Sequence, residues 1–277
     1  MELGMFTSGY RYYPLERAFA DAKRFGYDYI ELWGGRPHAY APDLARGGLA
    51  EVQDLMERYE IPVRVYTPEH NAYPYNYMLG GEEQRREALD YLKLAMDMAK
   101  ALGADYTLVS VAHGSYAVPR RERWARLVAC LRELAEHGEK IGQAIVLEAL
   151  THYESDLCTA AGELAQVLEE VNSPALLGMC DVVPPFVVRE PICDYLDLLG
   201  DRMAHLHLVD GDGASDTHFI PGDGQIPLPE LLEELYERGY QGRCTIELVT
   251  AYQNEPSLYA RRALRRVREI LPAGWKG

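Results

Sequence analysis

The sequence predicts a single (β/α)₈ barrel that spans residues 1–277, and three observations support this fold class. Short runs of β-branched and aromatic residues alternate with amphipathic stretches, which is typical of parallel βαβ units. Eight such runs are found, the number of strands that closes a barrel. The chain of 277 residues shows no linker or low-complexity segment, as expected for one domain. A doubly wound sheet is the alternative, but it normally brings a GxGxxG turn after the first strand, where Thr7-Ser8-Gly9-Tyr10 stands here.

The expected strands are, in chain order, Leu3–Thr7, Tyr29–Trp33, Val63–Thr67, Tyr106–Val111, Ala144–Ala149, Leu176–Asp181, Met203–Val209 and Cys244–Leu248. The stretches between them have the period of helices with one buried face. From Arg85 to Leu102, apolar residues recur at steps of three and four. The same spacing predicts the next helix from Trp124, Leu127, Leu131 and Leu134, and the seventh from Leu231, Leu232, Leu235 and Tyr236. After the sixth strand, only Pro191–Leu199 is available for a helix.

Charge and composition exclude several classes of partner. The formal net charge of −15 argues against nucleic-acid binding, which needs clustered basic residues. The one basic cluster lies at helical spacing in the last helix and is expected to form its solvated outer face: Arg261, Arg262, Arg265, Arg266 and Arg268. No apolar run is long enough for a membrane span, and the first residues lack a signal peptide pattern. We therefore expect a cytoplasmic protein with no membrane partner, and a homo-oligomer is left open.

Cysteine usage is consistent with this location. The five cysteines are odd in number and show no CxxC spacing. Reduced and mostly buried thiols are therefore expected.

Each of the last four predicted strands carries a potential metal ligand near its end, after apolar residues: Glu148, Asp181, His207 and Glu247. The carboxyl ends of barrel strands meet at one face, where functional side chains gather. Three carboxylates and an imidazole suit one divalent ion, Mn²⁺, Co²⁺ or Mg²⁺, with Zn²⁺ as a further candidate. The alternative is four unrelated polar residues that bind loop backbone groups.

Two residues near the predicted ligands need a separate interpretation. His205 is expected to face the helix layer, opposite to His207, which makes His207 the better ligand. Glu31, near the end of the second strand, is expected to anchor hydrogen bonds behind the metal ligands.

These residues resemble those of the xylose-isomerase-like barrels, and within them the ketose 3-epimerases, over essentially the whole chain. In that family the matching Glu, Asp, His and Glu bind one metal, and the two glutamates exchange protons with opposite sides of the substrate through an enediolate. The resemblance implies that Glu148 and Glu247 are this catalytic pair. The segment Leu147–Glu154 also matches and implies that Glu154 contacts substrate hydroxyls, although an exposed loop carboxylate is the alternative.

Long strings in the loops resemble a branch of this family that acts on a fructosamine, a ketose linked to an amino acid: Gly4–Thr7, Trp33–His38, Tyr73–Asn76, Val209–His218 and Ile220–Gly224. One departure is that the family's metal-binding Asp is commonly followed by a substrate-contacting His, where this chain has Pro184. The expected substrate is thus a small-molecule fructosamine or free ketose. Another sugar isomerase and an AP endonuclease are the remaining enzyme alternatives, and both Pro184 and the negative charge oppose the endonuclease. A catalytically silent sugar-binding barrel leaves the paired glutamates unexplained.

Further substrate contacts are predicted from the loops that follow the strands: Arg36, His38, Tyr73, Asn76, His113, Asp216 and His218. Loop packing, capping and structural hydrogen bonds are the alternatives for each. Arg36, Asp210, Asp212 and Asp216 are candidates for the charged end of a fructosamine. His70 is expected at the rim of the pocket.

Overall fold

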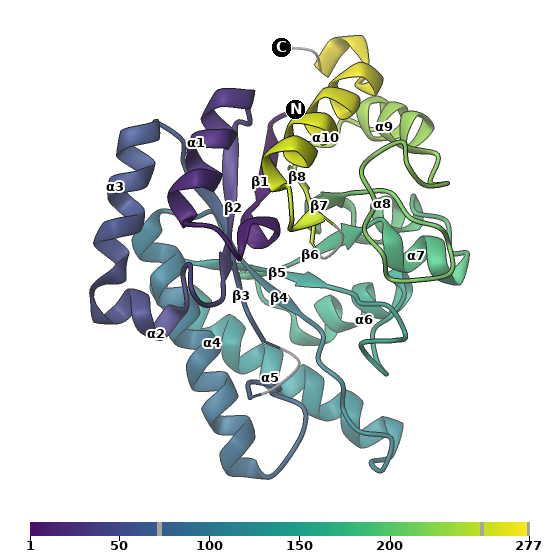
Figure 1. The fold of residues 1–277 in the computed structure, drawn as a ribbon. Helices are drawn as coiled ribbons and strands as arrows, with labels where there is room; N and C mark the ends of the chain where they lie inside the picture. The colour runs from purple at the N-terminus through teal and green to yellow at the C-terminus, as the bar shows by residue number, and fades with distance from the viewer. Residues whose placement is uncertain (71–73, 250–251, 276–277) are drawn as a thin grey trace.

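The computed structural model describes residues 1–70, 74–249 and 252–275, and its centre is a closed barrel of parallel strands (Figure 1). Each strand pairs with its neighbour in the chain, and β8 closes the barrel on β1. The strands are β1 Leu3–Phe6, β2 Tyr29–Gly34, β3 Val63–Pro68, β4 Tyr106–Ser110, β5 Ala144–Glu148, β6 Leu176–Asp181, β7 Met203–Leu208 and β8 Arg243–Ile246. The predicted fold class is confirmed, with strand ends shifted by at most two residues.

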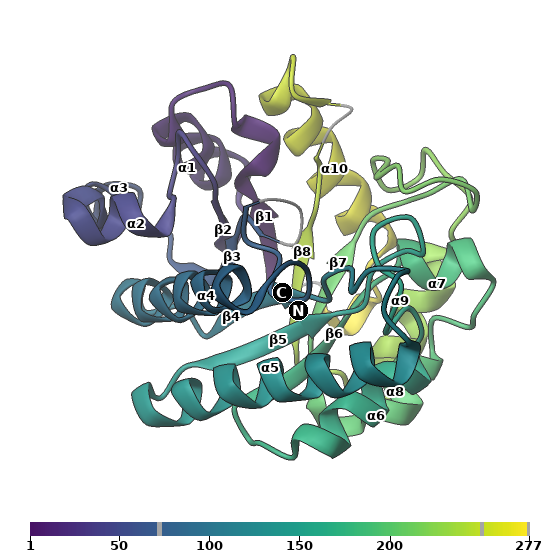
Figure 2. The same cartoon turned by 90° about the horizontal axis from the view of Figure 1, so that it is seen from below.

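Helices surround the barrel on its outside (Figures 1 and 2). They are α1 Leu15–Phe25, α2 Ala41–Asp43, α3 Leu49–Tyr59, α4 Glu82–Leu102, α5 Arg120–Ile141, α6 Ala161–Val171, α7 Val183–Val188, α8 Asp194–Leu199, α9 Leu228–Glu237 and α10 Pro256–Ile270. Short helical turns occur at η1 Thr7–Tyr10, η2 Leu44–Gly48, η3 Gly200–Arg202 and η5 Ala273–Trp275. None of the helices in the described ranges is long and apolar enough to cross a membrane.

The outer faces of the helices follow the predicted pattern. In α10, Ala263 and Val267 are fully buried against the barrel, whereas Arg261, Arg265 and Arg268 are exposed. The predicted arginine face is therefore confirmed for these three residues, whereas Arg262 and Arg266 are half-buried and pair with Asp223. All five cysteines are free thiols, and only Cys193 is partly exposed.

The region after β6 differs from the sequence prediction. The predicted helix is found as α8, but α7 precedes it and contains Pro184 and Pro185. Prolines are expected to break a helix, yet the first turn tolerates them because its N–H groups have no partner within the helix. The consecutive prolines therefore begin α7 instead of preventing it.

An apolar layer fills the lower part of the barrel interior. It consists of buried side chains from six neighbouring strands: Tyr29, Val65, Leu108, Val146, Met179 and Ala204. Two residues further along five of these strands stand Glu31, Thr67, Ser110, Glu148 and Asp181. Because side chains two apart on a strand share a face, the apolar layer supports a polar layer directly above it. The barrel is therefore not a pore, and its inward-facing polar groups gather towards the carboxyl ends of the strands.

Candidate metal centre and its pocket

The four predicted ligands come together at the carboxyl end of the barrel. One ligand atom from each of Glu148, Asp181, His207 and Glu247 lies within 4.8 Å of the others. Glu148 and Asp181 end β5 and β6, His207 lies beside Asp181 in the register of β6 and β7, and Glu247 directly follows β8. The exposed fractions range from 1% for His207 to 9% for Glu247, so the cluster is screened from solvent.

The carboxylates surround the His207 imidazole. Its Nδ1 lies 2.9 Å from Glu247 Oε2, 3.4 Å from Glu148 Oε1 and 3.9 Å from Asp181 Oδ2. Burial by itself lowers the pKa of His207, but Glu247 and Glu31 outweigh it and raise the pKa well above the ordinary value. Burial raises the pKa of Glu148, whereas His207 and His218 overcome burial at Glu247 and hold its pKa well below the usual range. The buried carboxylates of this cluster therefore need a positive charge beside them.

Two atoms of this cluster fit a bound metal ion. Among the described residues, His207 Nδ1 and Glu247 Oε2 are buried without a hydrogen-bond partner, although they face each other. A buried polar atom without a partner is costly, and a shared divalent cation satisfies both. The set of three carboxylates and one imidazole suits a mainly oxygen-liganded ion.

Behind the ligands, Glu31 connects two histidines of β7. Its Oε1 accepts hydrogen bonds from Thr67 Oγ1 at 2.7 Å and His207 Nε2 at 3.0 Å, and its Oε2 accepts one from His205 Nε2 at 2.9 Å. The two imidazoles overcome the effect of burial and lower the pKa of Glu31 far below its usual range. The expectation that Glu31 anchors hydrogen bonds behind the ligands agrees with these contacts.

The prediction that His205 faces the helix layer is wrong. His205 and His207 are two residues apart on one strand, so both point into the barrel, as the shared contact with Glu31 requires. His205 is fully buried below His207 and does not reach the metal cluster.

The cluster opens into a pocket of about 290 Å³ formed by the loops at this end of the barrel. Three of the predicted substrate contacts line it: Glu154, Asp216 and His218. His218 Nε2 lies 2.9 Å from Asp181 Oδ2 and 3.3 Å from Glu247 Oε2. It comes from the loop after β7.

The Asp210 carboxylate organises that loop by accepting backbone N–H bonds from Gly211, Gly222 and Ile226. Asp210 also pairs through its backbone with Phe219, next to His218. Asp210, a buried acceptor inside the loop, thus brings the His218 imidazole beside the metal ligands. His218 lies eleven positions beyond His207 in the sequence.

Glu154 and Asp216 form an acidic pair at the mouth of the pocket. Burial raises the pKa of Asp216 to about 6, against the opposing charge of His218. Partial burial and then Asp216 raise the pKa of Glu154, but Glu154 is an exposed residue at the rim, so solvent weakens this effect. The pair therefore favours a proton or a bound cation.

Other predicted contacts lie away from the cluster. Arg36 is 62% exposed and donates two hydrogen bonds to Asp43, at 2.6 and 2.8 Å. His38 Nε2 lies 2.8 Å from Tyr13 O, and both Arg36 and His38 line a separate groove. Their roles in substrate binding stay predictions.

The predicted contacts after β3 and β4 make local hydrogen bonds. Asn76 Oδ1 accepts the Met78 and Leu79 N–H groups, and its Nδ2 donates to His113 O. His113 Nδ1 accepts the Ser115 N–H at 3.0 Å. Tyr73 lies outside the described residues.

Some residues that line the pocket were not predicted from the sequence, among them Ser110 and Arg11. Ser110 Oγ donates to Glu148 Oε2 at 2.7 Å, and Ser110 N donates to Nε2 of His70, the residue predicted at the rim. Ser110 ends β4 in the same inward layer as Glu148, so the strand-end rule applied to serine would have found it. Arg11 lines the pocket above the Trp33 ring, and no pattern in the sequence indicates this.

Comparisons with known proteins agree with this geometry. A family model described as a xylose isomerase-like TIM barrel matches residues 19–270. The chain is 54% identical over 272 residues to the fructoselysine 3-epimerase of Escherichia coli O157:H7, covering 98% of this chain and 99% of that protein. It is 27% identical to the L-ribulose 3-epimerase of Methylomonas sp., covering 87% of this chain and 81% of that protein. The solved structure of D-psicose 3-epimerase with D-tagatose from Clostridium cellulolyticum H10 has a TM-score of 0.80 at 18% identity, covering 99% and 100% of the two chains.

Proposed function

The chain belongs to the xylose isomerase-like TIM-barrel family, and we propose that it catalyses the metal-dependent C3 epimerisation of fructoselysine to psicoselysine. It is an enzyme of the isomerase class, as its closely similar relatives are named epimerases. Glu148, Asp181, His207 and Glu247 hold one divalent ion in this proposal. Mn²⁺, Co²⁺ and Mg²⁺ are the preferred candidates, with Zn²⁺ as the alternative.

The convergence of Glu148 and Glu247 on one buried point is the observation that carries the proposal. Both carboxylates approach His207 Nδ1, yet they come from β5 and from the residue after β8, three strands apart around the barrel. Epimerisation beside a ketone removes a proton from one face of C3 and returns one to the other face. Two carboxylates from separate parts of the wall suit this task.

The chain's own residues perform the proton transfers. A divalent ion held there supplies a Lewis acid that increases the acidity of the C3 proton. One of the two glutamates takes the C3 proton with the C–H electron pair left on the substrate, and the other donates a proton to the opposite face. Ser110 keeps Glu148 in position by donating to its Oε2, which leaves Oε1 directed to the cluster. The net change is inversion at C3.

The charge of the pocket supports a fructosamine as the substrate. Six carboxylates line its described part, against the Arg11 guanidinium and the His218 imidazole, whose pKa, against the effect of burial, is raised well above the usual value by Asp181 and Glu247. Fructoselysine carries a basic secondary amine next to the ketone, so its cationic form complements such a pocket. Glu154, Asp216 and His218 are the proposed substrate contacts.

The test is a substrate panel in D₂O with added Mn²⁺. Fructoselysine, fructose, psicose and tagatose are incubated with the enzyme, and the configuration and deuterium content at C3 are followed by NMR. We expect psicoselysine with one deuterium at C3, and a kcat/KM for each free ketose lower by about 10-fold or more. Faster turnover of a free ketose makes the substrate assignment wrong. No exchange at C3 in any compound makes the proposed function wrong.

A further inference from the structure

A buried group lies below the metal cluster and consists of Glu31, His205 and His207. The proposed reaction needs no contact between these side chains and the substrate. All three side chains are at most 1% exposed. Glu31 reaches from β2 to two histidines of β7, which is not a neighbour of β2 in the barrel. The carboxylate therefore crosses the barrel interior to make these contacts.

The hydrogen bonds determine which nitrogen of His207 is free. Oε1 of the Glu31 carboxylate lies 3.0 Å from His207 Nε2 and accepts a hydrogen bond there, so Nε2 carries the proton. Metal binding displaces the proton from Nδ1, and the neutral imidazole that keeps its proton on Nε2 has its lone pair on Nδ1. Nδ1 is the atom that faces the three carboxylates of the metal cluster.

His205 stabilises the position of Glu31. It donates to Oε2, while Oε1 accepts from both Thr67 and His207. The other nitrogen of His205, Nδ1, is buried and has no hydrogen-bond partner among the described residues. Among the described contacts, the hydrogen bond that Nε2 donates to Glu31 therefore accounts for a histidine at position 205.

From these contacts we propose that Glu31 is a positioning residue that fixes the tautomer and ring orientation of His207 for metal binding, and that His205 holds Glu31 in place. One ligand atom from each of Glu31, His205 and His207 also lies within 4.8 Å of the others, an arrangement that could hold a second ion. The direct hydrogen bonds of 2.9 and 3.0 Å already occupy both Nε2 atoms, which favours the positioning role. The inference rests on the metal centre of the proposed function, but it does not depend on which sugar is the substrate.

The test measures metal affinity without any sugar. Mn²⁺ binding is titrated by EPR for the wild-type protein and for Glu31→Gln, whose amide offers an acceptor to only one imidazole and an N–H group to the other. Loss of such a carboxylate contact typically weakens metal binding by about 10- to 100-fold. We expect a weakening of that size. In the Zn²⁺-loaded wild-type protein, ¹H–¹⁵N NMR of the histidines should show a His207 proton on Nε2.

A matched pair at His205 keeps the test decisive if Glu31→Gln fails to fold. His205→Gln retains a donor near the place of Nε2, whereas His205→Leu removes it. We expect Mn²⁺ affinity within about 3-fold of wild type for His205→Gln and about 10-fold weaker for His205→Leu. A general loss of packing would lower the Tm of both variants without this difference in affinity.

Three results overturn the inference. The first is Mn²⁺ affinity within about 3-fold of wild type in a folded Glu31→Gln protein or in both His205 variants. The second is a proton on Nδ1 of His207 in the Zn²⁺-loaded protein. The third is binding of two Mn²⁺ ions by the wild type and one by Glu31→Gln, which would assign Glu31 to a second metal site. None of these readouts depends on epimerase activity, so they are separable from failure of the proposed function.

Discussion

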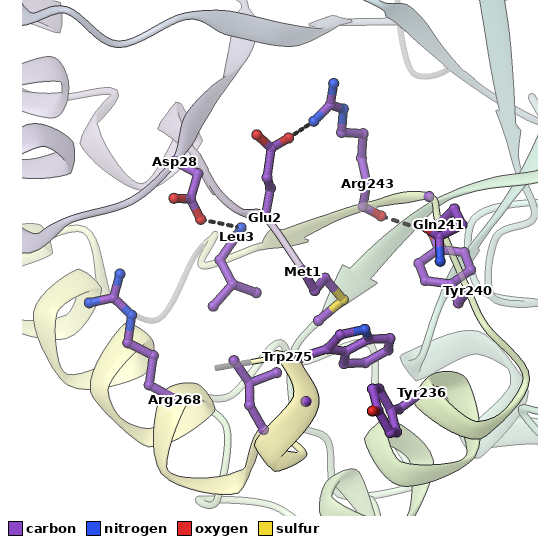
Figure 3. Close-up of a pocket in the computed structure, with 13 residues that line it drawn as sticks. Met1, Glu2, Leu3, Asp28, Tyr236, Tyr240, Gln241, Arg243, Arg268 and Trp275 are labelled. Carbon is purple, nitrogen blue, oxygen red and sulfur yellow. Dashed lines mark hydrogen bonds and ion pairs between the residues drawn. The ribbon is translucent and has the colours of Figure 1, made fainter. Parts of the chain in front are cut away.

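The two ends of the barrel each carry a pocket, and the larger of these two lies away from the candidate metal centre. The pocket at the amino end of the strands has a volume of about 880 Å³, against about 290 Å³ at the carboxyl end. Figure 3 shows the larger pocket between the start of β1, the start of β8 and the end of α10. Volume alone would therefore select the wrong end for the chemistry.

Charge compensation distinguishes the two ends. At the amino end, two carboxylates and two guanidinium groups line the pocket, and each has a partner. Arg243 pairs with Glu2, and Asp28 accepts the Leu3 N–H (Figure 3). Arg243 also pairs with Asp105, and Arg268 donates to Gly26 O. At the carboxyl end, six carboxylates face one guanidinium and the His218 imidazole, whose pKa, against the effect of burial, is raised well above the usual value by Asp181 and Glu247. The carboxyl end therefore requires charge from outside the chain, which is what a metal ion and a cationic substrate supply.

The largest difference between the ends should appear in catalysis. Glu148→Gln and Glu247→Gln each remove one of the two proposed proton-transfer groups, so we expect kcat on fructoselysine to fall by about 10³-fold or more. Asp28→Asn makes the same kind of change at the amino end and should leave kcat within about 2-fold. Epimer formation measured by NMR gives these rates. Wild-type deuterium exchange at C3 in both glutamine variants would contradict the two-glutamate mechanism.

Metal removal should affect stability through the carboxyl end alone. A ligand at 100 times its Kd stabilises the folded state by about 2.7 kcal/mol. For a chain of this size we therefore expect added Mn²⁺ to raise the Tm of EDTA-treated protein by on the order of 5 °C.

Two variants locate this effect. Asp181→Asn should lose most of the Mn²⁺-dependent shift in Tm, measured by calorimetry, and Asp28→Asn should retain it. A shift that survives in Asp181→Asn but disappears in Asp28→Asn would place the ion at the amino end.

The difference between the ends also explains which parts of the site could be predicted from sequence. Glu148, Asp181 and His207 were predicted together because the first two end their strands and His207 is one residue from the end of β7, and position along a short apolar run determines which end of the barrel a side chain reaches. Side chains two residues apart on a strand point to the same face, whereas the prediction put His205 and His207 on opposite faces. His205 was misplaced for this reason. His218 was predicted as a substrate contact, but its approach to Asp181 and Glu247 was not, because that approach depends on how Asp210 folds the β7 loop.

The local contacts of Arg36 and His38 could not be predicted for a similar reason. Their partners are Asp43, at the end of the short helix α2, and Tyr13, in the loop before α1, and the positions of both depend on tertiary packing. The balance of charge at either end likewise depends on contacts between distant parts of the chain, such as Arg243 with Asp105. Periodicity carries no information on such pairs.

A smaller effect should come from the acidic pair at the mouth of the carboxyl-end pocket. Asp216→Asn removes one negative charge that favours a cationic amine, so we expect kcat/KM for fructoselysine to fall by on the order of 10-fold. A free ketose has no amine and should be affected by less than about 3-fold.

The pH profile sharpens this prediction. Because burial raises the pKa of Asp216 to about 6, the residue is neutral below that pH and charged above it. The kcat/KM for fructoselysine should therefore rise between pH 5 and pH 7, and the rise should be smaller in Asp216→Asn. Equal losses on fructoselysine and fructose would show that Asp216 does not recognise the amine.

The smallest effect, and the most direct test of the amino end, should come from Arg243. Its guanidinium donates to Asp105 at 3.0 and 2.6 Å and is 24% exposed, while burial lowers its pKa. Arg243→Met leaves Asp105 and Glu2 without this partner, so we expect the free energy of unfolding in urea to fall by about 1–2 kcal/mol. The kcat/KM should stay within about 2-fold, since no metal ligand contacts Arg243. A 10-fold loss of kcat/KM without loss of stability would give the amino-end pocket a functional role and remove the distinction between the two ends.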